Sequence, residues 1–173
     1  MAVRPVLLLG DPRLREVAWP VDDPTAAAIR ALIHDLRDTM AAREGAGLAA
    51  PQIGVPLRLV IVGNNRPNRR YPDAPPLRQR VLINPRITTI GTERTAAEEG
   101  CLSVPDRRAA VERWQRIRCD FLDPQGGLRQ LEAEGFHARV IQHECDHLDG
   151  ILFPDRLRPP ASPHPGGPDG VGG

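Results

Sequence analysis

Apolar residues recur at helical spacing near the start of the chain, through Ile29, Leu32, Ile33, Leu36 and Met40. This period predicts an amphipathic helix over roughly 24–43, with one face packed on a core. Asp23 is suited to cap the first turn and Pro24 to occupy the first helical position. Glycines at positions 45 and 47 end the pattern. The helix is therefore expected to serve packing rather than chemistry.

Segments rich in β-branched residues follow the helix and predict strands at 57–62, 81–90 and 111–122. A turn sequence at 123–127 leads into 128–134, so the last two segments form a predicted hairpin. The apolar block at 6–9 also suggests a strand, because it is too short for the core of a signal peptide.

A second helical pattern runs through Phe136, Val140, Ile141 and Leu148, and Gly150 stops it. From 159 onward the chain is rich in Pro and Gly, which predicts a disordered tail. We therefore expect one domain over 1–158 and a tail over 159–173. Strands in the middle with helices at either end indicate the α+β class.

The amino-acid composition excludes several classes of function but does not indicate a particular one. The net charge is +1, so no general attraction to nucleic acid is expected, and all 23 basic residues are arginine. Without lysine, amine chemistry such as a Schiff base is excluded. Three cysteines without a secretion signal argue against a disulfide framework, and no apolar run approaches the roughly 20 residues of a membrane span. A cytoplasmic protein is expected.

The strongest chemical signal is the run His143-Glu144-Cys145-Asp146-His147 on the second predicted helix. Positions i and i+4 share a helical face, so two imidazoles can bind one metal ion, with Glu144 beside it to take a proton from water. Cys145 falls off that face and is expected to pack.

A catalytic metal site usually has three protein ligands, so a third must lie elsewhere. Phe153 stands where one protease class has a histidine. Asp149, Asp155 and His164 are downstream candidates, while Cys101 is the best upstream one, and spacing alone leaves its role as a ligand or a buried apolar residue open. Cys119 is expected in the core.

Three segments in this order resemble the peptide deformylase family. They are Gly45 to Gln52 (GAGLAAPQ), Glu99 to Ser103 (EGCLS) and Gln142 to His147 (QHECDH), and the likeness extends over roughly 5–158. The resemblance implies a single α+β domain. In this implied fold, antiparallel β-sheets pack around a central C-terminal helix that carries the HExxH motif. The domain also contains the N-terminal amphipathic helix.

The family's functional residues carry over by position. Cys101, His143 and His147 would bind the metal, Glu144 would be the general acid and base, and Gln52 and the backbone of Leu102 would hold the oxyanion. The implied substrate-binding residues are Gly45, Ala46, Gly47, Glu99, Gly100 and Arg108.

The implied reaction is hydrolysis of the formyl group from the N-terminal methionine of newly made polypeptides, with release of formate. The implied cofactor is one divalent ion, foremost Fe²⁺, with Zn²⁺, Ni²⁺ or Co²⁺ as substitutes. The implied partners are formylmethionyl nascent peptides and, transiently, the ribosome near its exit tunnel. Two alternatives remain: a zinc peptidase with a downstream third ligand, and a metal-containing protein without activity.

Overall fold

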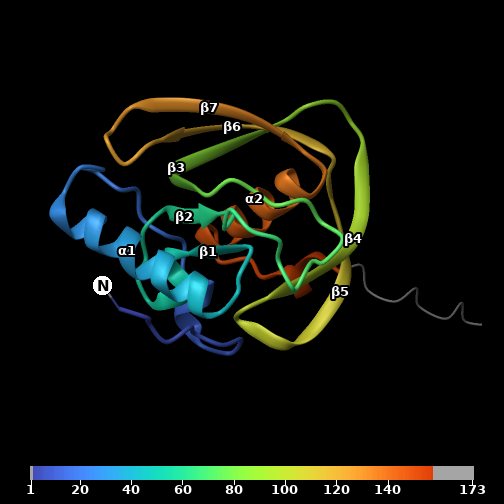
Figure 1. Cartoon of the computed structure of the whole chain (residues 1–173), viewed down its shortest axis with the longest axis horizontal. Coiled ribbons are helices and arrows are strands. Elements are labelled where there is room, and N and C mark those ends of the chain that lie inside the picture. Colours follow the sequence, from blue (N-terminus) through green and yellow to red (C-terminus); the bar gives the residue numbers. More distant parts are fainter. Residues whose placement is uncertain (1, 158–173) are drawn as a thin grey trace, which may run out of the picture.

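A computed structural model describes residues 2–157 and shows two helices with two antiparallel sheets (Figure 1). The larger sheet has the strand order β1-β2-β3-β6-β7 and the smaller one is the β4–β5 hairpin. The bounds are α1 Ala27–Ala42, α2 Gly135–Leu148, β1 Gly47–Ala49, β2 Leu59–Val62, β3 Arg80–Thr89, β4 Arg94–Cys101, β5 Val104–Trp114, β6 Arg116–Leu122 and β7 Leu128–Glu134.

The helices pack on the larger sheet from opposite sides, which explains why β2 is apolar at every position. Leu59 and Ile61 belong to the cluster of α1, whereas Val60 and Val62 belong to the cluster that contains Val140 and Ile141 of α2. Alternate side chains of a strand point to opposite faces, so a strand covered on both faces reads as a continuous apolar run.

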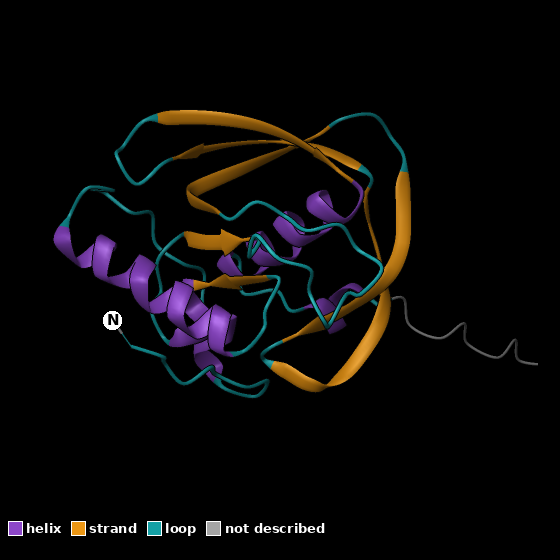
Figure 2. Ribbon diagram, viewed as in Figure 1, coloured by secondary structure: helices purple, strands orange, loops and turns teal. Residues whose placement is uncertain are grey.

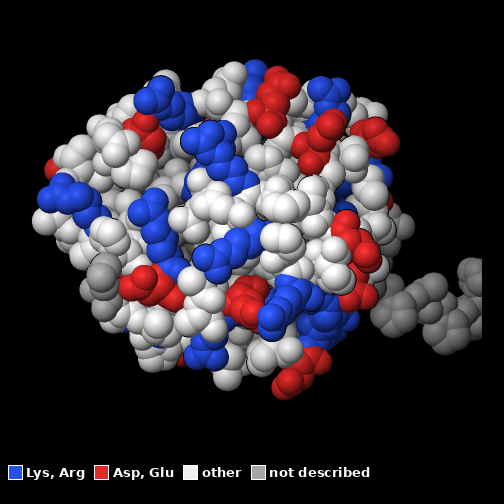
Figure 3. All heavy atoms as spheres, viewed as in Figure 1, with Lys and Arg blue, Asp and Glu red and all other residues white. Residues whose placement is uncertain are grey.

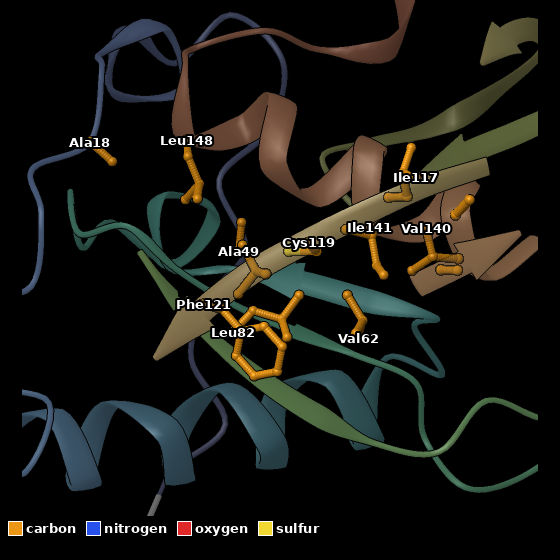
Figure 4. Packing of buried hydrophobic residues seen from close by; sticks show 13 residues of the cluster. Ala18, Ala49, Val62, Leu82, Ile117, Cys119, Phe121, Val140, Ile141 and Leu148 are labelled. Carbon is orange, nitrogen blue, oxygen red and sulfur yellow. The ribbon is translucent and has the colours of Figure 1, made fainter. Parts of the chain in front are cut away.

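Apolar side chains from α2, from the larger sheet and from the N-terminal segment form one buried cluster (Figure 4). Cys119 of β6 is fully buried there, as the sequence predicts, and Cys145 packs against the same cluster. The remaining labelled side chains in the figure come from α2, from the sheet and from the N-terminal segment: Ala18, Ala49, Val62, Leu82, Ile117, Phe121, Val140, Ile141 and Leu148.

Three boundary predictions are wrong. The first helix begins at Ala27 rather than 24, because the Asp23 carboxylate accepts hydrogen bonds from the backbone and hydroxyl of Thr25 (2.9 and 2.6 Å) and holds a turn there. The block at 6–9 is not a strand but an irregular segment. The amide of Leu7 donates to the carbonyl of Gln52 and the amide of Leu9 donates to the carbonyl of Ser103 (2.8 Å each), so the segment does not pair with a single strand.

The segment 111–122 is not one strand but parts of two. The chain leaves β5 at Trp114 and enters β6 at Arg116, so its two halves lie in different sheets (Figure 2). The β6–β7 hairpin itself is confirmed, with Leu122 opposite Leu128. The described part of the chain contains no helix long and apolar enough to cross a bilayer. The predicted tail at 159–173 lies outside the described residues.

Candidate metal centre and active-site cleft

The helix α2 brings the two histidines of the HExxH run together at the centre of the fold. Their ring centroids are 5.2 Å apart, and both side chains are buried. Gln142, just before them, ties the helix to the end of β5: its side chain donates to the carbonyl of Trp114 (2.8 Å) and accepts from the amide of Trp114 (3.0 Å). The helix is thereby fixed against the hairpin that supplies the next group.

Cys101 reaches the histidines from the tip of the β4–β5 hairpin. The register shifts after Gly100, so that Cys101 pairs with Val104 across a two-residue turn. Its sulfur lies 3.4 Å from Nε2 of His147. The ligand atoms of Cys101, His143 and His147 all lie within 4.8 Å of one another. The structure thus brings together the three residues that the resemblance implies as ligands.

The downstream alternatives for the third ligand are not brought to this cluster. Asp149 pairs with Arg58 (3.0 Å), and Asp155 pairs with Arg15 and accepts from the amide of Leu152 (2.9 Å). Phe153 is buried and stacks on the ring of His143 (6.2 Å between centroids). His164 lies outside the described residues.

Glu99 orients the first histidine. One carboxylate oxygen lies 2.8 Å from Nδ1 of His143, which leaves Nε2 free to bind a metal. Arg113 donates to both oxygens of Glu99 (2.9 Å each), and Arg139 donates to one (2.7 Å). Burial opposes charge on Glu99, but the hydrogen bonds from His143 and Arg113 prevail and lower its pKa to about 2. Glu99, which the resemblance implies as a substrate-binding residue, lines the cleft and is buried against the candidate metal ligand His143.

Cys101 is held in its metal-binding form. Burial alone would raise the pKa of its thiol, but the neighbouring imidazoles of His147 and His143 lower that pKa well below its usual value. The thiolate is the species that binds metals. A thiolate with two imidazoles is a donor set that suits zinc, ferrous iron, cobalt or nickel. The residues present therefore fit a divalent ion.

Glu144 lies beside the ligands with a free oxygen. Its Oε2 atom is buried and has no hydrogen-bond partner within residues 2–157. Burial raises the pKa of this carboxyl to about 7, against the opposing effect of the two histidines. The side chain lies over Gly47: a Cβ added there would be 2.6 Å from Oε1 and 2.7 Å from Cγ of Glu144. Only glycine fits at position 47 with Glu144 in this place.

Gln52 is directed at the same point from the short helix Ala50–Ile53. Its Oε1 accepts from the amide of Ala49 (2.9 Å), which turns Nε2 toward Cys101 Sγ (3.6 Å) and Ser103 Oγ (3.1 Å). An amide donor thus faces the cluster. Leu102 follows Cys101 in the hairpin turn and packs its side chain near Gly45.

The cleft is completed by the loop between β2 and β3, whose role the sequence leaves open. The hydroxyl of Tyr71 donates to the carbonyl of Gly100 (3.1 Å) and accepts from its amide (3.0 Å). The Tyr71 ring contacts Phe136 (5.0 Å between centroids), and Arg108 lies over its face (4.8 Å). Arg108 is also paired with Glu98 (2.6 Å). Ala46, which the resemblance places among the substrate-binding residues, lines the same cleft.

A profile of the polypeptide deformylase family matches residues 3–162. This chain belongs to that family. Peptide deformylase 1 of Prochlorococcus marinus is 56% identical over 162 residues, covering 94% of this chain and 84% of the relative. Peptide deformylase 1 of Bordetella pertussis is 53% identical over 156 residues, covering 90% and 88%.

Solved deformylases share the fold. A class I type b peptide deformylase from Acinetobacter baumannii, crystallised with Met-Ala-Ser bound, is similar with a TM-score of 0.86 and 42% identity, over 90% of this chain and 99% of that one. The same enzyme with the ligand K4U bound gives a TM-score of 0.87 at 41% identity, over 91% and 100%. The expected fold class and the expected enzyme family are confirmed.

Peptide deformylases remove the N-formyl group from nascent polypeptides, and membership of this family makes the chain a metal-dependent hydrolase of that kind. The zinc peptidase alternative also lacks its downstream ligand within the described residues, because Phe153 belongs to the core cluster around Cys101.

Proposed function

We propose that this cleft hydrolyses the formyl group of N-formylmethionyl peptides, with Cys101, His143 and His147 holding one divalent ion and Glu144 moving the proton. The observation that carries the proposal is the convergence of four groups from two segments that are far apart in the sequence, the β4–β5 hairpin and α2. Three ligand atoms lie within 4.8 Å of one another, and the free carboxylate oxygen of Glu144 belongs to the same helix as two of them.

A divalent ion in this position would polarise the formyl carbonyl and lower the pKa of a water molecule from 15.7 toward about 7. Glu144 takes a proton from the attacking water and delivers it to the departing amine, for which its pKa of about 7 is well matched. Gln52 and the backbone N–H of Leu102 donate to the developing oxyanion. Removing one such donor typically costs on the order of 10²–10³ in rate.

The peptide is held between two strand edges. β1 pairs only with β2 and is the edge of its sheet, and β4 pairs only with β5. An extended peptide can add to such an edge through backbone hydrogen bonds. The backbone of Gly47 on β1 supplies this contact, with Gly45 and Ala46 leading into it. Gly100, whose amide and carbonyl are bonded to the Tyr71 hydroxyl, lines the facing side of the cleft. The small formyl group suits so narrow a cleft.

The bound Met-Ala-Ser peptide of the A. baumannii enzyme is consistent with a formylmethionyl substrate. We further propose that the substrates are nascent chains near the ribosomal exit tunnel in the cytoplasm, and that the ion is Fe²⁺ with Zn²⁺, Ni²⁺ or Co²⁺ as substitutes. Metal analysis of anaerobically purified protein tests the choice of ion.

The test of the activity is formate release from formyl-Met-Ala-Ser by protein loaded with Fe²⁺ or Ni²⁺. Glu144→Gln keeps the shape of the side chain, so it should retain the metal and lose turnover. Glu132→Gln, an exposed change on β7, is the matched control and should leave turnover intact. Turnover that survives in Glu144→Gln would remove Glu144 from its assigned role, and no formate from the parent protein would overturn the proposal.

A further inference from the structure

A shallow groove adjoins the active-site cleft on the outer side of Cys101. Its apolar residues are Val6 and Leu8 from the N-terminal segment and Leu102 and Pro105 from the β4–β5 hairpin, and its rim carries Arg43 and Arg70. Cys101, Leu102 and Arg70 line both the groove and the cleft. The two spaces therefore adjoin at these three residues.

The two arginines of the rim have no anionic partner. Within residues 2–157 neither guanidinium forms an ion pair or a hydrogen bond, although most other arginines near the cleft form ion pairs. Arg43 is exposed and Arg70 is half-buried. A Cβ added at Gly100 would lie 3.1 Å from Nη2 of Arg70 and 2.6 Å from Nη1 of Arg108, so the Arg70 guanidinium lies at the proposed substrate edge beside that of Arg108.

The groove itself is lined by no carboxylate, and two acidic groups near it are already paired. Glu44 faces Arg69 (3.7 Å) and Glu98 faces Arg108 (2.6 Å), whereas Asp106, which follows Pro105 on the hairpin, forms no ion pair within residues 2–157. Figure 3 shows positive and negative groups interspersed over the viewed face, without one large patch of either sign. The positive charge at the groove therefore comes from the two guanidinium groups of its own lining rather than from a generally basic surface.

We propose that this groove is the subsite for the residues that follow the formylated methionine, and that Arg43 and Arg70 make the enzyme prefer a carboxylate there. The inference rests on the proposed function, because that function places the start of the peptide in the cleft. An extended chain advances about 3.3–3.6 Å per residue, so one or two residues beyond methionine suffice to reach a rim that shares Arg70 with the cleft. The apolar floor receives the aliphatic part of the peptide while the guanidinium groups meet its charge.

Two sources could supply the carboxylate: an acidic side chain, or the free C-terminus of a very short peptide. Peptides with an amidated C-terminus separate them. The probes are formyl-Met-Ala-Asp-amide and formyl-Met-Asp-Ala-amide, each compared with its lysine counterpart, and formyl-Met-Ala-Ser as free acid and as amide. The measured quantity is the ratio of kcat/KM within each pair.

We expect the parent enzyme to favour aspartate over lysine on the order of tenfold at one of the two positions, since each partly exposed charge pair contributes up to about fivefold. The ratio should fall toward one in the double variant Arg43→Gln/Arg70→Gln and should shrink as salt rises, because screening weakens exposed pairs. Arg37→Gln is the matched control, since it removes the same charge from an exposed site on α1 and should leave the ratio and the activity unchanged.

Aspartate-to-lysine ratios within twofold of one at both positions in the parent would overturn the proposal, and so would a ratio that is unaffected by the double variant. A preference seen only for the free-acid form of formyl-Met-Ala-Ser would limit the subsite to chain termini and overturn its role in long substrates. Absence of formate from every peptide would instead refute the proposed deformylase function, so the two failures are distinct.

Discussion

The contact between Gly47 and Glu144 gives a sharp prediction, because it makes a backbone position responsible for placing a catalytic side chain. In Gly47→Ala the new Cβ would lie 2.6, 2.7 and 2.8 Å from Oε1, Cγ and Cδ of Glu144. Ordinary contacts between carbon atoms are about 3.5–4.0 Å, so the carboxylate must retreat by roughly 1 Å. A misplacement of that size typically costs about 100-fold in rate.

We expect kcat for formyl-Met-Ala-Ser to fall about 100-fold in Gly47→Ala. The metal content should not change, because the contacts at position 47 are with Glu144 and not with a ligand. The assay is steady-state formate release, together with metal analysis and thermal unfolding. Gly91→Ala is the control for general destabilisation: its φ of +73° strains an alanine, but no atom lies within 4 Å of the added Cβ.

A double variant isolates the mechanism. If Gly47→Ala acts by displacing Glu144, then it should add little further loss in a Glu144→Gln background, where the proton carrier is already missing. Full kcat in Gly47→Ala, or a full 100-fold further loss in the Glu144→Gln background, would refute the assignment of position 47 to the support of Glu144.

The remaining predictions concern the surroundings of the site. Glu99→Gln should weaken metal binding about 10–100-fold in a chelator competition, because Glu99 orients His143. It should also lower the free energy of unfolding in urea by about 3–5 kcal/mol, because it leaves the buried Arg113 and Arg139 without their charged partner. An unchanged metal affinity would contradict the role of Glu99. Tyr71→Phe should speed hydrogen exchange at the Gly100 amide and cost about 1 kcal/mol; unaltered protection would show that the loop does not hold this edge. Burial and Asp120 raise the pKa of Cys119 from 9.0 to about 12, so between pH 9 and 12 the folded state keeps a proton that the unfolded state loses, and stability should fall as pH rises. Cys119 should contribute about 2 kcal/mol to the loss of stability between pH 8.5 and 10.5 in urea unfolding, so the loss should be smaller by about that amount in Cys119→Ala; an equal loss in both proteins would contradict it.

The elements that the sequence predicts well are those whose pattern reflects burial. α2 and β2 pack on the core along their length, so their apolar residues recur with a period or as a continuous run. β4 was not predicted, because five of its eight residues are exposed and its sequence Arg94–Cys101 lacks apolar alternation. β1 has only three residues, Gly47–Ala49, and owes its conformation to pairing with β2.

The division between β5 and β6 could not be read from residues 111–122, because β-branched and aromatic residues continue across the join, at Val111, Trp114, Ile117 and Phe121. The two strands are separated by a single residue, Gln115, which is held by tertiary hydrogen bonds. Its amide donates to the carbonyl of Glu93 (3.0 Å), and its carbonyl accepts from the amide of Gly135 (2.9 Å). Long-range bonds of this kind leave no local signal.

The site divides in the same way. Helical spacing places His143 and His147 on one face, but only the resemblance selected Cys101, since the hairpin that carries it lies more than 40 positions upstream. The resemblance implied Glu99 as a substrate-binding residue and gave no hint of its buried partners. Its neighbours Arg113 and Arg139 come from β5 and α2, and a charged residue at the buried position 113 was the one available hint of that network. Tyr71 comes from a loop without a repeating pattern.

The most direct test of the metal centre is the X-ray absorption spectrum of anaerobically purified protein at the edge of the metal it contains. One sulfur and two imidazole nitrogens should appear in the first shell, at about 2.3 Å and 2.0–2.1 Å if the ion is zinc, and Cys101→Ser should lose the sulfur contribution. A first shell without sulfur in the parent protein, or one that is unchanged in Cys101→Ser, would contradict the assignment of Cys101, His143 and His147 as its ligands.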